Sequence, residues 1–416
     1  MPKEKKEIFD VAVIGGGPAG MMAAGRAGEL KKKVVLLEKN ESLGKKLLLS
    51  GGSRSNITNA EFDLKSLAKK YGREGDFLLS PFSLFGPWET INFFEKRGLR
   101  TKTEKGKRVF PESDRAEDVL STLVDYLKKG GVEIYFNSAV EKIVKEKNKI
   151  SKVILKDGRE IESRSYIICT GGKSYPETGS SGEGYEWAEA LGHKVEKLRP
   201  ALVPLNIKEA WPKTISGLSL EKVGLTVFQN GKKQDSRLGE LLFTHFGLSG
   251  PVVLDLSKNI GELLEKGQVD LVLDLKPDLA SQELDKIFQD DFFKDGTKFL
   301  KNYLSNLFPQ RLGLIIMELS GADPMKKTNA ITREERQRLA GLLKSLRMTV
   351  ASLLGFETAI VTSGGVSLKE IDSKTMRSKL VENLFLAGEI INLQGPSGGY
   401  NLQLCWSTGY LAGQEA

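Results

Sequence analysis

A glycine-rich turn near the N-terminus constrains this chain more than any other feature. Residues Phe9–Gly20 read FDVAVIGGGPAG, an apolar β-forming run that leads directly into a GxGxxG pattern and then into a helix-like stretch. In such a strand–turn–helix unit the first glycine permits the sharp turn, the second lets the backbone approach a pyrophosphate, and the third lets the helix pack on the strand. The helix N-terminus adds unpaired N–H groups and the positive end of its dipole. We therefore predict a dinucleotide cradle formed by Gly15, Gly17, Pro18, Ala19 and Gly20.

A second apolar strand, Lys33–Lys39 (KVVLLEK), ends in an acid. Glu38 follows Gly20 by eighteen residues, the spacing at which a carboxylate accepts hydrogen bonds from both hydroxyls of an adenosine ribose. The same carboxylate would repel a 2′-phosphate, so FAD or NAD is expected there, with Glu38 and Lys39 at the adenosine end. The glycine pattern alone would also fit an ordinary glycine-rich turn, but the strand, the helix and the acid together argue against one.

Three further segments favour FAD over NAD. Gly44–Asn59 (GKKLLLSGGSRSNITN) is rich in glycine and small polar residues and can pass close to a flavin, and Ile167–Gly172 (IICTGG) is a short strand that ends in Thr-Gly-Gly. Leu384–Gly413 holds a strand, an acid, a glycine turn and a helix. The residues expected to line the cofactor in these segments are Gly51, Gly52, Asn56, Thr170, Gly171, Gly172, Gly388, Glu389, Gly398, Gly399, Tyr400, Asn401 and Leu402.

The last of these segments is expected to contact the flavin end of the cofactor. Glu389 is positioned to bind the ribityl hydroxyls, although it would also serve to cap the turn that follows it. A helix that begins near Gly398 would direct its positive end at the flavin N1–C2=O locus, where negative charge accumulates on reduction. We predict FAD bound noncovalently, because Cys405, the cysteine expected in the cofactor-facing segments, lies about two helical turns beyond Gly398. Cys169 and Cys405 are both expected to be buried in packing.

These segments resemble a family of bacterial NAD(P)/FAD-dependent oxidoreductases known as HI0933-like or BaiN-like. The likeness spans nearly the whole chain. It is carried by LLLSGGSRSNITN (Leu47–Asn59), GKRVFPESDRAEDV (Gly106–Val119), TGGKSYPETGSSGEGYEWAEALGH (Thr170–His193), LLFTHFGLSGP (Leu241–Pro251), and TSGGVSLKEID through GPSGGYNLQ (Thr362–Gln403). Two positions depart from the family pattern: Ser55 stands where many members carry cysteine, and Arg377 where glutamate is usual. The first departure argues against thiol chemistry at that loop.

The order of the segments predicts the domain organisation. Both ends of the chain must meet at one cofactor, so residues 1–195 and 352–416 are expected to form a discontinuous Rossmann-type FAD-binding domain of the α/β class. Repeated strand signals predict an inserted β-barrel or sandwich over residues 196–256, and a helical pattern predicts a mainly helical region over residues 257–351. Ile134–Ser163 is expected to form a small three-stranded crossover sheet.

Residues for substrate chemistry are harder to identify, because a flavin carries the electron transfer itself. His245, in the family-type FTHFGLSGP segment, is the best candidate for an acid or base, with a hydrogen-bonded structural histidine as the alternative. Tyr400 either faces the ring or packs between domains. Arg54 and Arg108 either orient an anionic substrate or form surface salt bridges. His193 is expected to mark a helix end.

No second GxGxxG pattern follows a strand after residue 38, so NAD(P)H is expected to dock only transiently at the flavin. The prediction is an FAD-dependent reductase or dehydrogenase of a small organic substrate. The resemblance implies reduction of an enone, as in bile-acid dehydroxylation, or oxidation of a small amine. The alternatives are a flavin oxidase of a small amine that uses O2, an RNA-modifying flavoprotein, and a noncatalytic flavoprotein.

The composition argues against several kinds of binding partner, namely metals, membranes and nucleic acid. With two cysteines far apart and two histidines, metal sites are not expected. No apolar run approaches the roughly 20 residues of a membrane span, and Met1–Phe9 lacks a signal-peptide core, so a cytoplasmic protein without membrane contact is expected. The net charge of +8 is concentrated in Glu95–Arg108 and Lys326–Met348, each with seven basic and two acidic residues. No aromatic-basic motif accompanies either segment, so nucleic acid is not a favoured partner.

Overall fold

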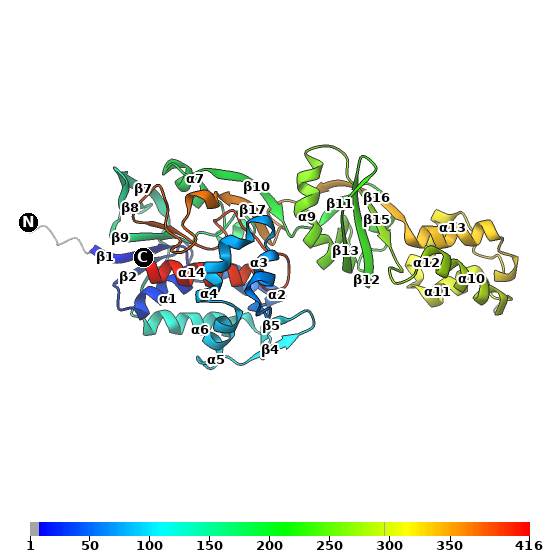
Figure 1. The fold of residues 1–416 in the computed structure, drawn as a ribbon, viewed down its shortest axis with the longest axis horizontal. Helices are drawn as coiled ribbons and strands as arrows, with labels where there is room; N and C mark the ends of the chain where they lie inside the picture. The colour runs from blue at the N-terminus through cyan, green and yellow to red at the C-terminus, as the bar shows by residue number, and fades with distance from the viewer. Residues whose placement is uncertain (1–7, 295) are drawn as a thin grey trace, which may run out of the picture. The chain divides into compact units, whose positions relative to one another are not determined.

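The computed structural model describes residues 8–294 and 296–416 (Figure 1). The chain divides into two compact units. The first unit joins the residues up to Pro200 with Phe356–Ala416, and the second unit is Ala201–Gly355. Both ends of the chain therefore build the first unit, and the second unit is an insertion.

A parallel sheet forms the centre of the first unit. Its strands, in spatial order, are β6 (Glu133–Tyr135), β2 (Val34–Leu37), β1 (Ile8–Ile14), β9 (Glu160–Ile168) and β18 (Leu384–Leu386). In register, Val13 lies between Leu36 of β2 and Ile167 of β9. β2 and β18 are wholly apolar, and Tyr166–Ile168 of β9 are buried, as expected where helices cover both faces of such a sheet. Parallel strands end at one common edge, so the loops after β1, β2, β9 and β18 all emerge there.

β9 also belongs to a small antiparallel sheet. Its first half pairs with β8 (Lys149–Leu155), which pairs with β7 (Val140–Glu146). The expected crossover sheet therefore exists, but it begins later than Ile134, because Ile134 and Tyr135 lie in β6 and pair with β2.

Two helices from opposite ends of the sequence pack closely in this unit. α1 (Pro18–Glu29) lies against α14 (Tyr400–Glu415) (Figure 1). A Cβ atom at Gly409 would lie 2.4 Å from the carbonyl oxygen of Ala19, and one at Gly413 would lie 2.2 Å from that of Ala23. The absence of side chains at these two positions lets the helix backbones touch, and this contact joins the two segments of the unit.

The remaining elements of the first unit surround this core. They are α2 (Lys45–Ser53), β3 (Thr58–Asn59), α3 (Leu64–Lys69), α4 (Leu79–Leu84), α5 (Pro87–Glu95), β4 (Thr101–Glu104), β5 (Arg108–Pro111), α6 (Ala116–Lys129), α7 (Glu183–Ala190), β10 (Val195–Ala201) and β17 (Val361–Val366). β3, β5 and β4 form a separate antiparallel sheet, and β10 pairs with β17.

The second unit combines a closed barrel with helices. Barrel strands in spatial order are β11 (Leu205–Ile207), β14 (Gly247–Ser249), β13 (Lys232–Phe243), β12 (Ser219–Gln229), β15 (Asp270–Asp274) and β16 (Leu346–Leu353). The helices are α8 (Trp211–Thr214), α9 (Pro251–Leu264), α10 (Ser281–Lys294), α11 (Leu300–Leu307), α12 (Gln310–Ser320) and α13 (Arg333–Lys344). The fold class predicted from the sequence is confirmed: a discontinuous Rossmann-type unit with an inserted barrel and helices.

The expected divide between residues 256 and 257 does not separate barrel from helices. β15 and β16 close the barrel from within the range expected to be mainly helical, and they pair with each other and with strands on the other side of that divide. A short apolar run such as Leu271–Leu273 does not show which partner it will find, because the pairing is decided by distant strands.

Candidate functional site

The glycine-rich turn follows β1 and leads into α1. Gly15 has a φ of 105°, and a Cβ atom there would lie 2.6 Å from the carbonyl oxygen of Cys169. At Gly20 a Cβ atom would lie 1.8 Å from the carbonyl oxygen of Gly15, so a side chain would push α1 away from the turn. Gly17, in contrast, has no atom within 4 Å of its Cβ position. Since α1 begins without a side-chain cap or an acidic residue in its first turn, this open space suits an anionic group.

Glu38 is buried directly after β2 and faces the same turn. Its Oε2 accepts a hydrogen bond from the Gly16 N–H at 2.8 Å, and its Oε1 accepts one from the Asn40 N–H at 2.8 Å. The Asn40 side-chain amide also donates to Oε1, at 2.8 Å. These three bonds orient Glu38, and the carboxylate keeps a further lone pair for ribose hydroxyls. The Lys39 ammonium pairs at 2.6 Å with Glu183, the first residue of α7, and donates a hydrogen bond to Ser181 in the preceding loop; its contact with the cofactor stays a prediction.

Glu389 lies after β18, at the same edge of the sheet. Its Oε2 is 2.9 Å from Nζ of Lys46, and its Oε1 accepts a hydrogen bond of 2.7 Å from the N–H of Thr362. A Cβ atom at Gly172 would lie 2.8 Å from that Oε1 atom, so the Thr-Gly-Gly turn also closes on the acid. Four separate segments of the chain therefore meet at this carboxylate.

Lys46 and Thr362 were not identified from the sequence. Thr362 lies inside a segment that carries the family resemblance and Lys46 directly precedes another, but nothing in their local pattern indicates an acid more than twenty residues away as their partner. The structure shows their role: they hold the Glu389 carboxylate, whose side chain is only 15% exposed.

The segment between Lys46 and β3 has an unusual backbone. Gly51 and Gly52 have φ values of 58° and 67°, and Ser53 and Ser55 adopt left-handed conformations with φ of 65° and 58°. Non-glycine residues rarely take this conformation. The strain is a feature of a loop held in place by its surroundings, as is common at ligand sites.

Two asparagines tie this loop to the start of α14. In the amide orientation that satisfies its neighbours, Asn56 accepts a hydrogen bond from the Gly399 N–H at 3.0 Å. Asn59 donates one to the Gly398 carbonyl oxygen at 3.1 Å. Gly398 and Gly399 have φ values of 111° and 95°, and α14 begins without a side-chain cap. The structure thus brings together Asn56 and the two glycines predicted to approach the flavin.

The residues after these glycines stabilise the turn. Tyr400 is buried, its ring centre lies 6.2 Å from that of Tyr71, and its carbonyl oxygen accepts a 2.7 Å hydrogen bond from the Tyr71 hydroxyl. The Asn401 amide bonds back to Gly395 at 2.9 Å. Leu402 packs against the core. Tyr400 therefore belongs to an aromatic cluster within the first unit, whereas the packing alternative placed it between domains; its contact with the flavin stays a prediction.

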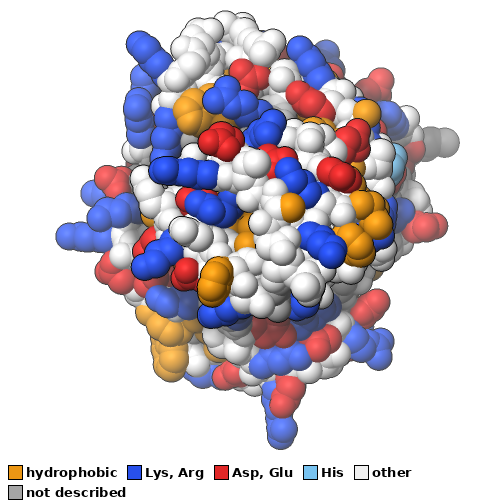
Figure 2. Space-filling model, turned by 90° about the vertical axis from the view of Figure 1, so that its right-hand side faces the viewer, with side chains coloured by type: hydrophobic (Ala, Val, Ile, Leu, Met, Phe, Trp, Pro, Cys, Tyr) orange, Lys and Arg blue, Asp and Glu red, His pale blue; other side chains and the backbone are white. Residues whose placement is uncertain are grey.

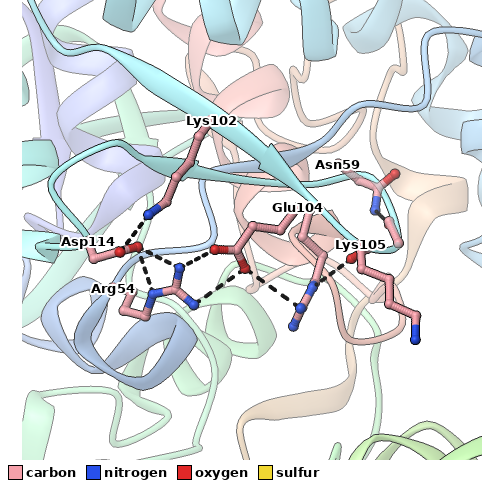
Figure 3. Close-up of polar contacts among 8 residues, drawn as sticks. Arg54, Asn59, Lys102, Glu104, Lys105 and Asp114 are labelled. Carbon is pink, nitrogen blue, oxygen red and sulfur yellow. Dashed lines mark hydrogen bonds and ion pairs between the residues drawn. The ribbon is translucent and has the colours of Figure 1, made fainter.

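Arg54 forms a network of ion pairs instead of presenting a free cation (Figure 3). Its Nε donates to Oδ1 of Asp114 at 2.8 Å, its guanidinium also pairs with Glu104, and its Cζ lies 4.1 Å from the ring centre of Phe110. Lys102 binds the other oxygen of Asp114. Hydrogen bonds from Lys102 and then Arg54 hold the pKa of Asp114 below its usual range. Arg54 cross-links the strained loop to the β4–β5 hairpin, as its salt-bridge alternative predicts.

The two histidines differ sharply. His245 is exposed in the turn between β13 and β14 of the second unit, with its ring against Phe246. His193 is buried, with Nδ1 3.1 Å from Oε2 of Glu370 and Nε2 2.9 Å from Oγ of Ser378. Burial lowers the pKa of His193, although its bond to Glu370 acts in the opposite direction. His193 therefore has a structural role beyond marking a helix end.

Comparison with known protein families identifies the family of this chain. The pattern of the HI0933-like protein Rossmann domain matches residues 9–415. This chain belongs to the HI0933-like family. Its relatives include the 3-dehydro-bile acid delta(4,6)-reductase of Clostridium scindens, 32% identical over 413 residues with 98% of each chain covered. The ribosomal RNA dihydrouridine synthase of Escherichia coli is 30% identical over 412 residues, again with 98% of each chain covered.

Solved structures of oxidoreductases share the fold of this HI0933-like protein at low sequence identity. The 3-ketosteroid delta1-dehydrogenase of Sterolibacterium denitrificans aligns with a TM-score of 0.54 at 14% identity and covers 98% of both chains. The 3-ketosteroid-delta4-(5alpha)-dehydrogenase of Rhodococcus jostii aligns with a TM-score of 0.51 at 15% identity and covers 99% of this chain and 98% of that one. The chain is an FAD-dependent oxidoreductase, as predicted.

The residues at the sheet edge fit FAD. Besides the open space at Gly17 and the two oriented acids, three buried side-chain oxygens lack a hydrogen-bond partner among the described residues: Ser55 Oγ, Asn59 Oδ1 and Thr170 Oγ1. All three lie in the segments expected to line the cofactor. Buried polar atoms normally have a hydrogen-bond partner, so these oxygens are suited to bonds with a polar ligand.

Among the described residues, no helix is both long and apolar enough to cross a membrane.

Proposed function

We propose that this protein reduces a carbon–carbon double bond conjugated to a carbonyl group, with NADH or NADPH as the electron donor. Two relatives support the proposal. Both cover nearly the whole chain, and their names, a delta(4,6)-reductase of a 3-dehydro compound and a dihydrouridine synthase, describe the same chemical change. A 3-oxo group conjugates with a double bond at position 4, and the uracil double bond is conjugated to a ring carbonyl. The shared reaction class is therefore saturation of an enone or enone-like bond.

The observation that carries the proposal is the convergence of four segments at the Glu389 carboxylate. Bound and reduced FAD would supply the hydride for the electron-poor carbon. The glycine turn and the start of α1 would bind the pyrophosphate, and Glu38 the adenosine ribose. Glu389, held by Lys46 and by the N–H of Thr362, would bind the ribityl hydroxyls. The uncapped start of α14 would place a positive dipole end where negative charge accumulates.

NAD(P)H would act as a transient co-substrate. Among the described residues the parallel sheet of the first unit is the sole dinucleotide-type sheet, since the barrel strands of the second unit pair antiparallel. A donor without its own domain must deliver its electrons and leave before the substrate is reduced, which predicts ping-pong kinetics. Overall, NAD(P)H and one proton are consumed and two hydrogens are added across the double bond.

Anaerobic half-reactions test this function. The holoenzyme is mixed with NADH or NADPH while flavin absorbance is followed, and the reduced protein is then mixed with a 4-en-3-one steroid or with its saturated analogue. We expect bleaching by one nucleotide, followed by reoxidation with the enone alone and one saturated product per flavin. Reduction by amines but not by nicotinamides, with rapid reoxidation only in air, would instead support the amine oxidase.

A further inference from the structure

An exposed aromatic pair lies beside the basic hairpin of the first unit. Phe62, just after β3, is 53% exposed, and Trp88, in the first turn of α5, is 60% exposed. Their ring centres are 6.1 Å apart and their planes meet at 81°. Single exposed apolar residues are ordinary, but two large rings in contact with each other at the surface point to a binding function.

A basic turn lies next to Phe62 of this pair. The turn between β4 and β5 carries Lys105, Lys107 and Arg108, all of them exposed. It lies next to Phe62, because Lys107 bonds to Glu61 at 2.8 Å and its carbonyl oxygen accepts from the Ala60 N–H at 2.7 Å. Lys105 forms no ion pair among the described residues, and Figure 3 shows its ammonium extending away from the Arg54 network.

The turn Lys105–Arg108 carries three cations and no carboxylate. Lys107 and Arg108 pair with Glu61 and Glu104, and Asp63 and Glu89 stand next to the two rings in the sequence. Lys105 is therefore the cation of this turn that is most available to an anionic partner. No linear motif revealed this surface, because Phe62, Trp88 and the hairpin are far apart in the sequence.

We propose that this surface, formed by Phe62, Trp88 and the turn Lys105–Arg108, docks single-stranded RNA. Aromatic faces stack unpaired bases, and cations follow the phosphate backbone. The surface is attached to the candidate flavin site: Asn59, which bonds to Gly398, precedes Phe62 by three residues, a span of at most about 11 Å. One bound strand therefore reaches both places. The inference rests on the proposed function, since uracil carries the required double bond, and it is consistent with RNA-modifying relatives.

The second basic segment lacks this combination. Figure 2 looks onto the α10–α13 end of the second unit and shows Lys and Arg side chains interspersed with acidic ones. Lys326 pairs with Glu335 at 2.8 Å, and Arg336 pairs with Asp285 at 2.7 Å. Phe293 is 91% exposed there, and its ring packs against no other aromatic ring among the described residues. Substitution of Phe293 is therefore a matched control.

Binding of fluorescent oligouridine to the oxidised holoenzyme tests the docking surface. Loss of base stacking is worth roughly 1–3 kcal/mol per base, so Phe62→Ala and Trp88→Ala should each weaken binding about 5- to 150-fold. Trp88→Phe should retain most of the affinity, and Phe293→Ala should change nothing. Lys105→Gln should reduce the slope of log affinity against log salt by about 1. Flavin absorbance and the unfolding temperature verify that the variants are folded.

Outcomes separate the docking surface from the proposed reaction. If wild-type protein does not bind oligouridine, or if Phe62→Ala and Trp88→Ala bind as wild type does, the docking proposal is wrong, whether or not the enzyme reduces a steroid enone. Binding of duplex RNA with the same affinity as oligouridine would also contradict the docking proposal. So would a result in which a protein partner covers Phe62 and Trp88 and RNA does not. Binding at this surface without reduction of any conjugated double bond would support docking and contradict the proposed function.

Discussion

The Lys46 ammonium lies 2.9 Å from the Glu389 carboxylate and joins residues 343 positions apart in the sequence. Both side chains are largely buried, at 22% and 15% exposure. A bond between charged groups in such a setting is worth about 1.5–3 kcal/mol, and its loss leaves a carboxylate without its counter-ion. The pair therefore fixes the orientation of the acid proposed to bind the ribityl chain.

Replacing the lysine tests this role. Lys46→Met should weaken FAD binding about 10- to 150-fold, because Glu389 loses the group that orients it. Lys46→Arg keeps the charge with a different shape and should be intermediate. Flavin fluorescence during dilution gives the dissociation constants. Among the residues with described positions, Lys45 pairs with exposed Glu41 alone, so an unchanged affinity in Lys45→Met is the control. Normal FAD affinity in Lys46→Met would show that the pair is merely structural.

Substitution of Glu38 and of Glu389 by alanine should have different effects on FAD binding and flavin reduction. Glu38→Ala should lower FAD affinity about 10- to 150-fold through lost hydrogen bonds to the adenosine ribose, while the saturated enzyme is reduced at the wild-type rate. Its loss also frees the N–H groups of Gly16 and Asn40, so the glycine turn should become less ordered. Stopped-flow reduction at saturating FAD measures the rate. Slow reduction of saturated Glu38→Ala would place this acid at the flavin end.

Glu389→Ala should affect both affinity and rate. Without the acid the flavin can shift relative to the start of α14, and a displacement of about 1 Å can cost a hundredfold in rate. Glu389→Gln keeps one acceptor oxygen and should recover part of the affinity. Anaerobic reduction by the preferred nicotinamide, at saturating FAD, is the measurement. Reduction of Glu389→Ala at the wild-type rate would show that the ribityl placement is wrong.

Two glycines of the turn provide a matched pair of substitutions. In Gly20→Ala the new methyl would lie 1.8 Å from the Gly15 carbonyl oxygen, so both the fold and FAD binding should suffer. In Gly17→Ala the methyl has no neighbour within 4 Å, and the φ of −80° suits alanine. The apoprotein should therefore keep its unfolding temperature, while FAD affinity falls because the methyl occupies the phosphate position. Unchanged FAD affinity in Gly17→Ala would contradict the cradle.

His193 predicts a pH dependence of stability. Burial lowers its pKa below the usual value of about 6.5, so the unfolded chain takes up a proton before the folded one does. The stability contributed by neutral His193 is therefore complete above pH 6.5 and declines as the pH falls below it. His193→Gln can still bond to Ser378 and should lose this decline. Urea unfolding of the holoenzyme at pH 7.5 and 5.5 compares the two proteins; parallel losses would exclude His193 as the source.

The expectations that hold from sequence concern residues close together in the chain. The strand–turn–helix unit around Gly15, Gly17 and Gly20 and the acid after the second strand are local, and the structure places them as expected. The FAD-dependent oxidoreductase class followed from their combination with the later segments, and it is confirmed. The sequence allows two roles each for Tyr400 and Arg54; in the structure Tyr400 is buried and Arg54 forms ion pairs, and their contacts with a ligand stay predictions.

By itself, the sequence determined the dinucleotide fold, because a GxGxxG turn between a strand and a helix admits few other structures. Only the tertiary structure decided which distant residues meet. Lys46 reaches Glu389, Phe62 contacts Trp88, and β15 and β16 complete the barrel. Such contacts depend on the order in which strands pair and helices pack. The residues next to a lysine or an exposed aromatic ring in the sequence do not indicate which distant residue it will contact. Local geometry is determined by neighbouring residues, whereas long-range contacts depend on the whole fold.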